Sequence, residues 1–398
     1  MTSGVSRPSI CFVAHNAYGA ISGRLRDHVG GIEHQQALMA RWLAARGHPI
    51  TMLTWDEGQR DEEYFAGVRV LKMCSRSAGL RYVRFVYPRW TSLCGALRRA
   101  QADIYYYNCG DLGLGQIVWW CRRNGRRSVY SVASDPDCDA RLPVLRPWRE
   151  RVLYRYGLRH VDLVVVQTQR QRTMLAGGFG RHAAVLPMPC PDLNPQGRQR
   201  AAGPRADSVR ILWVGRFSPE KRLEWLLALA ERCPQWTFDV VGAANRGAVY
   251  GSALVERARR LPNVRLHGRV AHDRLVEFYL NATALCCTSA YEGFPNTFLE
   301  AFSVGLPVVT TFDPDGLIGR LGLGAVGRSV GELAGQLQLL LRYPGRWQAI
   351  SASCRRYFES THRLDVSMPR FEEVFRQLGA GRTATAPGTP ELVAAVGR

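Results

Sequence analysis

The chain has 398 residues, 46% hydrophobic and 22% charged, a globular composition that excludes a mainly disordered protein. This length predicts two domains rather than one core. The net charge is +20, and only two of the 53 basic residues, Lys72 and Lys221, are lysines. Such a surplus attracts anions. Because the arginines are dispersed and no nucleic-acid-binding motif accompanies them, an anionic membrane surface is favoured over nucleic acid as a large partner.

Neither a signal peptide nor a membrane-spanning segment is predicted. Residues 1–8 lack a basic region followed by an apolar run, and no apolar stretch approaches the roughly 20 residues that span a bilayer. The eleven cysteines are scattered without a CxxC pair, which argues against a zinc site and against a disulfide framework. We therefore expect a cytoplasmic protein with reduced cysteines and no bound metal.

The first half of the chain begins with a βαβ pattern. A strand at 9–15 precedes a glycine-bearing loop, a helix over 32–46 and a strand at 49–55. Further strands are predicted at 68–73, 104–107, 128–133, 163–167 and 184–187. Strands alternating with helices predict a parallel sheet covered by helices, so residues 1–190 are expected to form one doubly wound α/β domain.

A second alternation follows residues 191–208, whose Pro, Gly and Arg content is typical of a linker. Its strands are predicted at 209–214, 237–241, 264–267, 284–288 and 307–311, with helices at 223–231, 254–260, 273–281 and 295–304. Residues 209–366 should form a second doubly wound domain. Ligands bind such domains beyond the carboxyl ends of the strands, which places a site in a cleft between two facing domains.

Two short segments close the chain. Residues 367–379 carry apolar side chains at helical spacing, so this helix has a face to bury. Residues 380–398 are rich in Gly, Ala, Pro and Thr and are expected to be a disordered tail.

The segment 289–307 carries the most chemical information. Pro295 is suited to the first position of a helix, which would present the amides of Asn296 and Thr297 to a diphosphate. A nucleotide sugar bound along this helix would place its sugar near Glu292 and its ribose near Glu300, where carboxylates can accept hydroxyl hydrogen bonds. By itself the pair is equally compatible with an acid favoured by the helix dipole and a solvated helix glutamate.

Three short motifs in this segment decide between those interpretations: Glu292-Gly293-Phe294, Leu299-Glu300-Ala301 and a Gly-Leu-Pro-Val-Val strand at 305–309. Together they resemble the E-x7-E element of the family-four retaining glycosyltransferases of the GT-B fold, of the kind that builds bacterial cell-surface polysaccharides or glycolipids. The resemblance implies two Rossmann-like domains and a nucleotide diphosphate sugar donor. It also implies retention at the anomeric carbon without metal or cofactor.

The resemblance also assigns roles to residues. Glu292 would act in catalysis, and the donor would contact the residues that follow it and the second glutamate: Gly293, Phe294, Pro295, Asn296, Thr297 and Glu300. The family often has glycine where this chain has Pro295. In these proteins the final helix crosses back to the first domain, which predicts the same for residues 367–379.

A pair of cations is expected beside these carboxylates. Arg216 follows the first strand of the second domain and Lys221 opens the next helix, where both could neutralise a leaving diphosphate without metal. The spacing resembles the family's V-G-R-x4-K element. The resemblance also implies that the backbone of Val270 contacts the nucleotide base.

In the first domain, Gly30 and Gly31 begin a helix and permit close approach of a ligand to the backbone. They resemble the family's G-G-x-E element, which lies across from the diphosphate. Asp135 follows a strand where many relatives have a histidine facing the acceptor, so it is a candidate catalytic residue.

Several interpretations remain open at this stage. Residues 81–99 mix aromatic residues with arginines, and an amphipathic core helix is as compatible with the pattern as a membrane-interface patch. For the whole chain, the first hypothesis is transfer of a hexose-type sugar to a carbohydrate or lipid-linked acceptor. The alternatives are a GT-B sugar phosphorylase or nucleotide-sugar epimerase, and a non-catalytic protein that binds nucleic acid or membrane through its basic surface.

Overall fold

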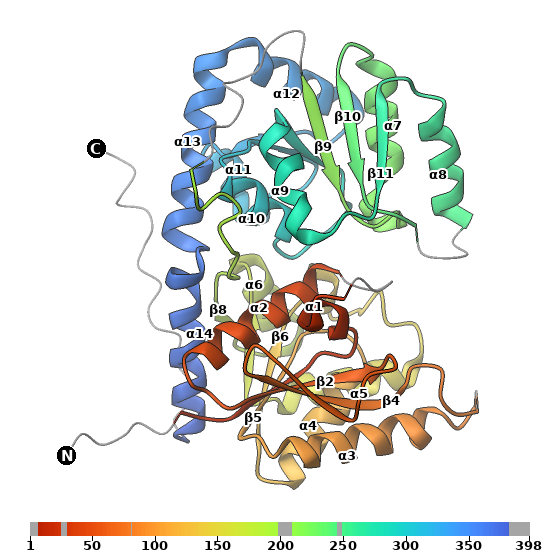
Figure 1. Cartoon of the computed structure of the whole chain (residues 1–398), viewed down its shortest axis with the longest axis vertical. Coiled ribbons are helices and arrows are strands. Elements are labelled where there is room, and N and C mark those ends of the chain that lie inside the picture. Colours follow the sequence, from red (N-terminus) through yellow and green to blue (C-terminus); the bar gives the residue numbers. More distant parts are fainter. Residues whose placement is uncertain (1–6, 25–29, 81, 198–208, 245–248, 382–398) are drawn as a thin grey trace, which may run out of the picture. The chain divides into compact units, whose positions relative to one another are not determined.

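The chain divides into two compact units in the computed structural model, which describes residues 7–24, 30–80, 82–197, 209–244 and 249–381. Unit 1 comprises Met1–Pro187 and the segment from Ser367 onward, and unit 2 comprises Met188–Val366. The sequence predicted boundaries at 190 and 366. The linker residues 198–208 and the tail from 382 lie outside the described residues. Each unit is an α/β domain built on a parallel sheet (Figure 1), which confirms the predicted fold class.

Unit 1 contains an eight-stranded sheet in the order β3-β4-β2-β1-β5-β6-β7-β8. All neighbouring strands run parallel except β3 and β4. The strands are β1 Ile10–Val13, β2 Ile50–Asp56, β3 Glu62–Phe65, β4 Val68–Ser75, β5 Ile104–Tyr107, β6 Arg127–Ser131, β7 Leu163–Val166 and β8 Ala184–Val185. Only β3 was not predicted, since it is a polar, half-exposed edge strand. The two residues joining it to β4, Ala66 and Gly67, have φ of 48° and 79°, as in a tight hairpin turn.

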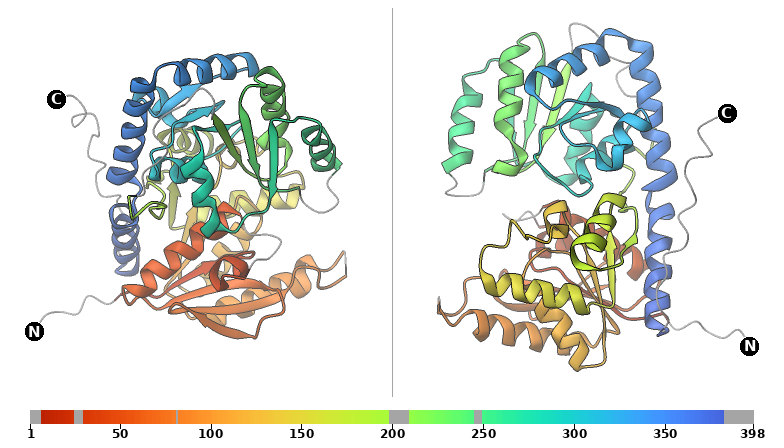
Figure 2. Two further views of the ribbon diagram at one scale, coloured as in Figure 1. Left: turned by 45° about the horizontal axis from the view of Figure 1, so that its top comes forward. Right: turned by 180° about the vertical axis from the view of Figure 1, so that it is seen from behind.

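Helices cover both faces of this sheet (Figure 2). The side chains of β5 illustrate the two faces. Tyr105 and Tyr107 point into a core formed with α3, α4 and α5. Tyr106 points to the opposite face, where its ring lies 6.1 Å from that of Phe375 in the C-terminal helix α14, Leu364–Gly379. The helices of this unit are α1 Tyr18–Ser22, α2 Gly31–Ala45, α3 Thr91–Ala100, α4 Gly113–Arg123, α5 Trp148–His160 and α6 Gln169–Phe179, with a π-helical turn at Phe85–Trp90 and a 3₁₀ turn at Asp135–Cys138.

The helix α14, Leu364–Gly379, belongs to both units, because the division falls between Val366 and Ser367. From Ser367 onward it packs on unit 1. Glu372 there accepts a hydrogen bond from Arg46 at 2.9 Å and contacts His48 at 3.1 Å. The face that it buries consists of Met368, Phe371, Val374, Phe375 and Leu378.

Unit 2 contains a fully parallel six-stranded sheet in the order β11-β10-β9-β12-β13-β14. Its strands are β9 Arg210–Val214, β10 Thr237–Val241, β11 Val264–Gly268, β12 Ala284–Cys287, β13 Val308–Thr310 and β14 Gly324–Val326. The short β14 was not predicted. Gly324 brings it against β13 with φ of 155°, and a Cβ at this position would lie 1.8 Å from the carbonyl oxygen of Val308.

Helices cover both faces of this second sheet as well (Figure 2). One core joins the sheet to α7, α8, α12 and the start of α13. Elsewhere α10 packs on α13, with the rings of Phe302 and Tyr357 5.9 Å apart. The helices are α7 Leu223–Arg232, α8 Val249–Arg259, α9 His272–Asn281, α10 Asn296–Ser303, α11 Leu317–Arg320, α12 Val330–Arg342 and α13 Pro344–Thr361, with 3₁₀ turns at Pro219–Lys221 and Pro314–Gly316.

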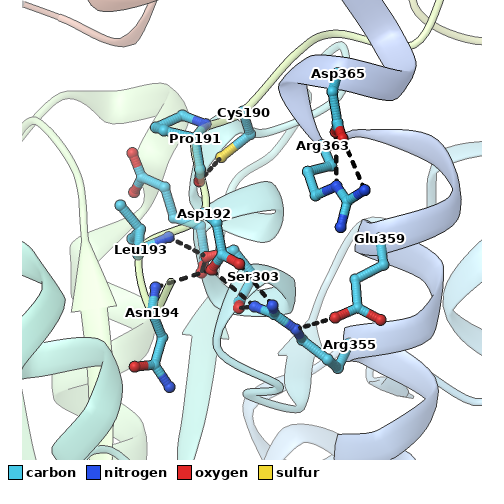
Figure 3. Close-up of polar contacts among 11 residues, drawn as sticks. Cys190, Pro191, Asp192, Leu193, Asn194, Ser303, Arg355, Glu359, Arg363 and Asp365 are labelled. Carbon is cyan, nitrogen blue, oxygen red and sulfur yellow. Dashed lines mark hydrogen bonds and ion pairs between the residues drawn. The ribbon is translucent and has the colours of Figure 1, made fainter. Parts of the chain in front are cut away.

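The chain entering unit 2 is held by polar contacts with α10 and α13 (Figure 3). The amide of Cys190 donates to the carbonyl oxygen of His362 at 2.8 Å. Asp192 accepts two hydrogen bonds from the guanidinium of Arg355, at 2.8 and 2.6 Å, and Arg355 also binds Glu359 at 2.7 Å. A bidentate pair fixes both distance and orientation. Asp192, which was predicted to lie in the linker, and Cys190, which was predicted to lie in the first domain, therefore belong to unit 2.

Candidate functional site

The predicted donor residues of unit 2 lie at or after the carboxyl ends of strands β9, β11 and β12. The loops after β9 and β10 approach each other closely. Gly242 has φ of 137°, and a Cβ there would lie 1.8 Å from the carbonyl oxygen of Gly215. The amide of Gly215 also donates to the carbonyl oxygen of Val241 at 3.0 Å. Glycine is therefore required where the chain turns out of β10.

Lys221 and Glu292 form an ion pair at this edge of the sheet. Lys221 ends the 3₁₀ turn Pro219–Lys221 that follows β9, and Glu292 lies in the loop after β12. The carboxylate oxygen that binds Lys221 also accepts a hydrogen bond from the hydroxyl of Ser289 at 2.6 Å. The Lys221 and Glu292 side chains are 24% and 16% exposed. The structure thus brings together two residues that the sequence predicted to be catalytic.

Arg222 holds the two loops that carry this ion pair. Its guanidinium donates to the carbonyl oxygens of Thr288 and Ser289 at 2.7 and 2.9 Å and to the hydroxyl of Thr311 at 3.0 Å. The hydroxyl of Thr288 in turn donates to the carbonyl oxygen of Lys221 at 2.8 Å. Sequence reasoning assigned Arg222 no role, because nearly every basic residue of the chain is arginine.

Arg216 is more exposed than Lys221. Its side chain is 66% exposed, and its guanidinium lies 3.6 Å from the carboxylate of Glu220. An exposed pair at this distance contributes little stability. Arg216 is therefore positioned by the β9 loop and not by a tight side-chain contact.

The helix α10 carries the second predicted glutamate. It begins at Asn296, and Pro295 precedes it with an extended ψ of 127°. The prediction that Pro295 is the first helical residue is therefore wrong, because only its φ of −62° matches a helix. The amides of Asn296 and Thr297 lie in the first turn.

Glu300 is fixed by two side chains of α9. One carboxylate oxygen lies 3.1 Å from Nε2 of His272, and the other accepts a hydrogen bond from the hydroxyl of Tyr279 at 2.5 Å. The hydrogen bond to this carboxylate raises the pKa of His272. The pKa of Tyr279 is also raised, mainly because the hydroxyl is buried and to a lesser extent because Glu300 is negatively charged. A carboxylate has about four lone-pair positions, so Glu300 retains capacity for a ligand hydroxyl. Sequence reasoning missed both partners, since no motif links them to Glu300.

The other residues predicted to bind the donor differ in how accessible they are to a ligand. The ring of Phe294 is buried between Phe298 and His362, with centroids 6.4 and 5.1 Å away, so only its backbone is available to a ligand. Gly293 beside it is also buried. Val270 lies between β11 and α9 and is half-buried.

In unit 1, Gly30 precedes α2 and Gly31 is the first residue of that helix. The amide of Gly30 donates to the carboxylate of Glu33 at 3.0 Å, and a Cβ on Gly30 would lie 2.8 Å from the same oxygen. The glycine thus permits a cap in which Glu33 is the acceptor.

Asp135 follows β6 in the 3₁₀ turn Asp135–Cys138. Its carboxylate accepts a hydrogen bond from Gln171 at 3.2 Å and lies 3.3 Å from Nε of Arg170. Asp137, two residues later, was not predicted. Burial raises the pKa of Asp137 to about 6, although hydrogen bonds from Ser134 oppose the shift. An acid in this state is a perturbed group of the kind found at functional sites.

The described residues offer neither a metal-binding cluster nor a membrane-spanning helix. Within 7–24, 30–80, 82–197, 209–244 and 249–381, no three His, Cys, Asp or Glu side chains are grouped so that they could hold a metal ion. None of the helices in these ranges has the length and apolar character needed to span a bilayer.

Two family models together match most of the chain. Residues 30–191 match "Glycosyl transferase 4-like domain", and residues 208–342 match "Glycosyl transferases group 1". The first runs from the start of α2 through β8 and does not include β1, and the second includes Lys221, Glu292 and Glu300.

Relatives with partial matches come from several bacteria. A 166-residue stretch is 31% identical to D-inositol 3-phosphate glycosyltransferase of Kribbella flavida and covers 37% of this chain and 38% of that protein. A 167-residue stretch is 27% identical to the GtfA subunit of a UDP-N-acetylglucosamine–peptide N-acetylglucosaminyltransferase of Streptococcus parasanguinis and covers 39% of this chain and 32% of that protein. The match thus spans about a third of each relative.

Solved structures match over nearly the whole chain. Sucrose-phosphate synthase of Thermosynechococcus elongatus superposes with a TM-score of 0.76 at 18% identity, covering 94% of this chain and 100% of that one. HepE of Anabaena, in complex with UDP and glucose, superposes with a TM-score of 0.69 at 17% identity, covering 92% and 98%. At these identities the likeness establishes the fold.

Proposed function

Because the chain belongs to the GT-B glycosyltransferases, with a glycosyl transferase 4-like domain and a glycosyl transferases group 1 domain, we propose that it transfers a hexose-type sugar from a nucleotide diphosphate sugar to a carbohydrate or lipid-linked acceptor. The observation that carries this proposal is the ion pair of Lys221 and Glu292 at the carboxyl edge of the unit 2 sheet, with Glu300 on the adjacent helix. Ligands of parallel α/β sheets bind at this edge.

In this proposal the donor binds along α10. Glu300 accepts hydrogen bonds from the ribose, and Glu292 binds the transferred sugar. Lys221 has three N–H donors, so it can keep Glu292 and bind a phosphate oxygen at the same time. Arg216, whose side chain is largely exposed, can turn toward the second phosphate. The solved complexes of HepE with UDP and glucose, and with UDP-glucose, support a nucleotide-sugar donor.

We infer further that the reaction proceeds with retention and without metal. Lys221 and Arg216 would supply the positive charge that stabilises the leaving diphosphate. Asp135 would lie on the acceptor side, whereas the backbone of Gly30 and Gly31 would contact the donor. A role in synthesis of cell-surface polysaccharide or glycoconjugates follows from the same resemblance.

The direct experiment is a panel of radiolabelled nucleotide sugars incubated with the protein and a membrane extract as the source of acceptors. We expect one donor to label a carbohydrate or lipid product, with no loss of activity in EDTA. Phosphate-dependent release of a sugar phosphate would instead identify a phosphorylase, and interconversion of nucleotide sugars an epimerase. Activity abolished by EDTA and restored by manganese or magnesium would contradict the metal-independent mechanism.

We also propose that unit 1 contacts an anionic membrane. Large apolar side chains are exposed together in residues 80–87 and 144–152, among them Tyr82 at 92%, Tyr87 at 70% and Trp148 at 77%. The guanidinium of Arg149 lies 5.2 Å from the ring centroid of Phe85, which connects the two stretches. Residues 76–99 contain six arginines and no acidic residue. Exposed aromatic residues among arginines suit the interface of an anionic bilayer.

A further inference from the structure

Unit 1 contains a polar cavity of about 200 Å³ at the carboxyl ends of β1 and β2 and the start of α2. A cavity of this size accommodates a monosaccharide-sized group. The residues that matter for its chemistry are His15, Glu33, Gln36, Arg76, Arg89 and Asp111.

Three of these side chains have a buried polar atom without a hydrogen-bond partner among the described residues. The atoms are Nε2 of His15, Nε2 of Gln36 and Nε of Arg89. Gln36 is only 3% exposed. Buried polar groups in folded proteins are nearly always paired, so three unpaired ones around one cavity indicate a bound polar ligand.

Arg76 and Arg89 have no acidic partner in the part of the chain that the structure describes. Within the described residues neither Arg76 nor Arg89 forms an ion pair with a carboxylate, and Arg89 donates one hydrogen bond to the carbonyl oxygen of Arg76 at 2.5 Å. Burial, and then the neighbouring charge of Arg84, lowers the pKa of Arg89. A half-buried guanidinium in a positive environment is stabilised by a bound anion.

The acidic side chains of the cavity are already used by the protein. Glu33 accepts the hydrogen bond from Gly30 at 3.0 Å. Asp111 accepts hydrogen bonds from the hydroxyl of Tyr107 at 2.6 Å and from the amide of Gly113 at 2.7 Å. These bonds fix both carboxylates, while the arginine pair keeps donors for a ligand.

His15 adds a neutral hydrogen-bonding group. Burial lowers its pKa, and the weaker effect of Asp111 opposes the shift. The ring stacks on Trp55, with centroids 4.7 Å apart and planes 19° apart. A neutral imidazole can accept a hydrogen bond from a ligand hydroxyl or donate one to it.

We propose that this cavity binds the acceptor through a carboxylate or phosphate substituent held by Arg76 and Arg89, while Gln36 and His15 bind hydroxyl groups of the same sugar. The acceptor is then an anionic carbohydrate, such as a uronic acid or a sugar phosphate. This inference rests on the proposed glycosyltransferase function and narrows its acceptor class.

The test measures binding to the full chain by NMR titration without donor, using methyl α-glucuronide, glucose 6-phosphate, inorganic phosphate and the neutral methyl α-glucoside. We expect both anionic sugars to bind at least about tenfold more tightly than the neutral glucoside, and more tightly than inorganic phosphate. Arg76→Gln and Arg89→Gln should each remove the preference. Arg98→Gln, an exposed residue of α3, is the matched control and should retain it.

Equal binding of charged and neutral sugars, or a preference that persists in both variants, would overturn the inference. Arg76→Gln is the variant less prone to a folding defect. Arg89 donates its hydrogen bond to the backbone carbonyl oxygen of Arg76, which the substitution does not remove. UDP, GDP and ADP titrations run in parallel report on unit 2. An anion preference without any nucleotide binding would count against the proposed function, whereas nucleotide binding without an anion preference would count against this inference.

Discussion

At the scale of single residues, the chain provides its own control for the proposed diphosphate contact. Its two lysines both have carboxylate partners: Lys221 binds Glu292, and Lys72 lies 3.2 Å from Asp61 in unit 1. We expect Lys221→Ala to lower the transfer rate by about 10²–10³-fold, the typical loss for a charge-stabilising donor, while Lys72→Ala leaves it nearly unchanged. The measurement is the transfer rate at saturating donor. Wild-type rates in both variants would disprove the assignment of Lys221 to the diphosphate.

The two glutamates should separate in a second experiment. Glu300→Gln should weaken nucleoside diphosphate binding by about 10- to 100-fold, since a lost hydrogen bond to a charged group costs roughly 1.5–3 kcal/mol. Glu292→Gln should leave that affinity intact and reduce transfer, because in the proposed function Glu292 contacts only the sugar. Calorimetric titration with UDP, GDP and ADP distinguishes them, and equal affinity losses would show that the donor does not lie along α10.

The same residues show how far a sequence can locate a site. Glu292, Glu300 and Lys221 lie in short motifs with a fixed order, and those motifs were sufficient to nominate them. Their partners Ser289, Tyr279 and His272 could not be found in this way, because hydrogen bonds between side chains depend on how α9 and the β12 loop pack.

At the scale of elements, the surface of residues 80–87 and 144–152 makes a prediction about lipids. Replacing Tyr82, Tyr87 and Trp148 together by serine should abolish co-flotation with vesicles rich in phosphatidylglycerol, because the aromatic side chains supply the apolar part of interfacial binding. The matched control replaces Tyr64 and Tyr343, which are 66% and 49% exposed elsewhere. Unchanged flotation of the triple variant, or equal binding to neutral phosphatidylcholine vesicles, would contradict the proposal.

Most elements could be predicted because the central strands are buried on both faces and are nearly continuous apolar runs, as in β7 and β12. The exceptions have local causes. The edge strand β3 consists of two glutamates followed by two aromatic residues, without the alternation of a half-buried strand, and β14 has three residues that begin with glycine. The π-helical turn Phe85–Trp90 contains Pro88 and has no buried side chain. Its sequence therefore has no clear apolar face, and it did not decide between a core helix and a membrane-interface patch.

At the scale of the whole molecule, α14 determines where the chain can be shortened. Truncation after Gly379 should leave stability unchanged. Truncation before Ser367 should destabilise unit 1, since five buried apolar side chains would be removed at roughly 1.5–3 kcal/mol each. Thermal melting of both forms tests this. Phe375→Ala tests the same face with a point substitution and should lower the free energy of unfolding by about 3–5 kcal/mol. A wild-type melting temperature for the chain that ends before Ser367 would refute the role of α14.

Unit 2 is an insertion whose two ends meet. Within unit 1, the hydroxyl of Ser367 binds the carbonyl oxygen of Pro187, and within unit 2, Cys190 pairs with Arg363. A segment whose ends are adjacent can be replaced by another of the same fold without displacing the host chain around it. Genetic recombination at these two points would therefore exchange one unit as a block. In the proposed function, such an exchange replaces the donor-binding unit while the acceptor-binding unit is kept, so donor and acceptor specificity can evolve separately.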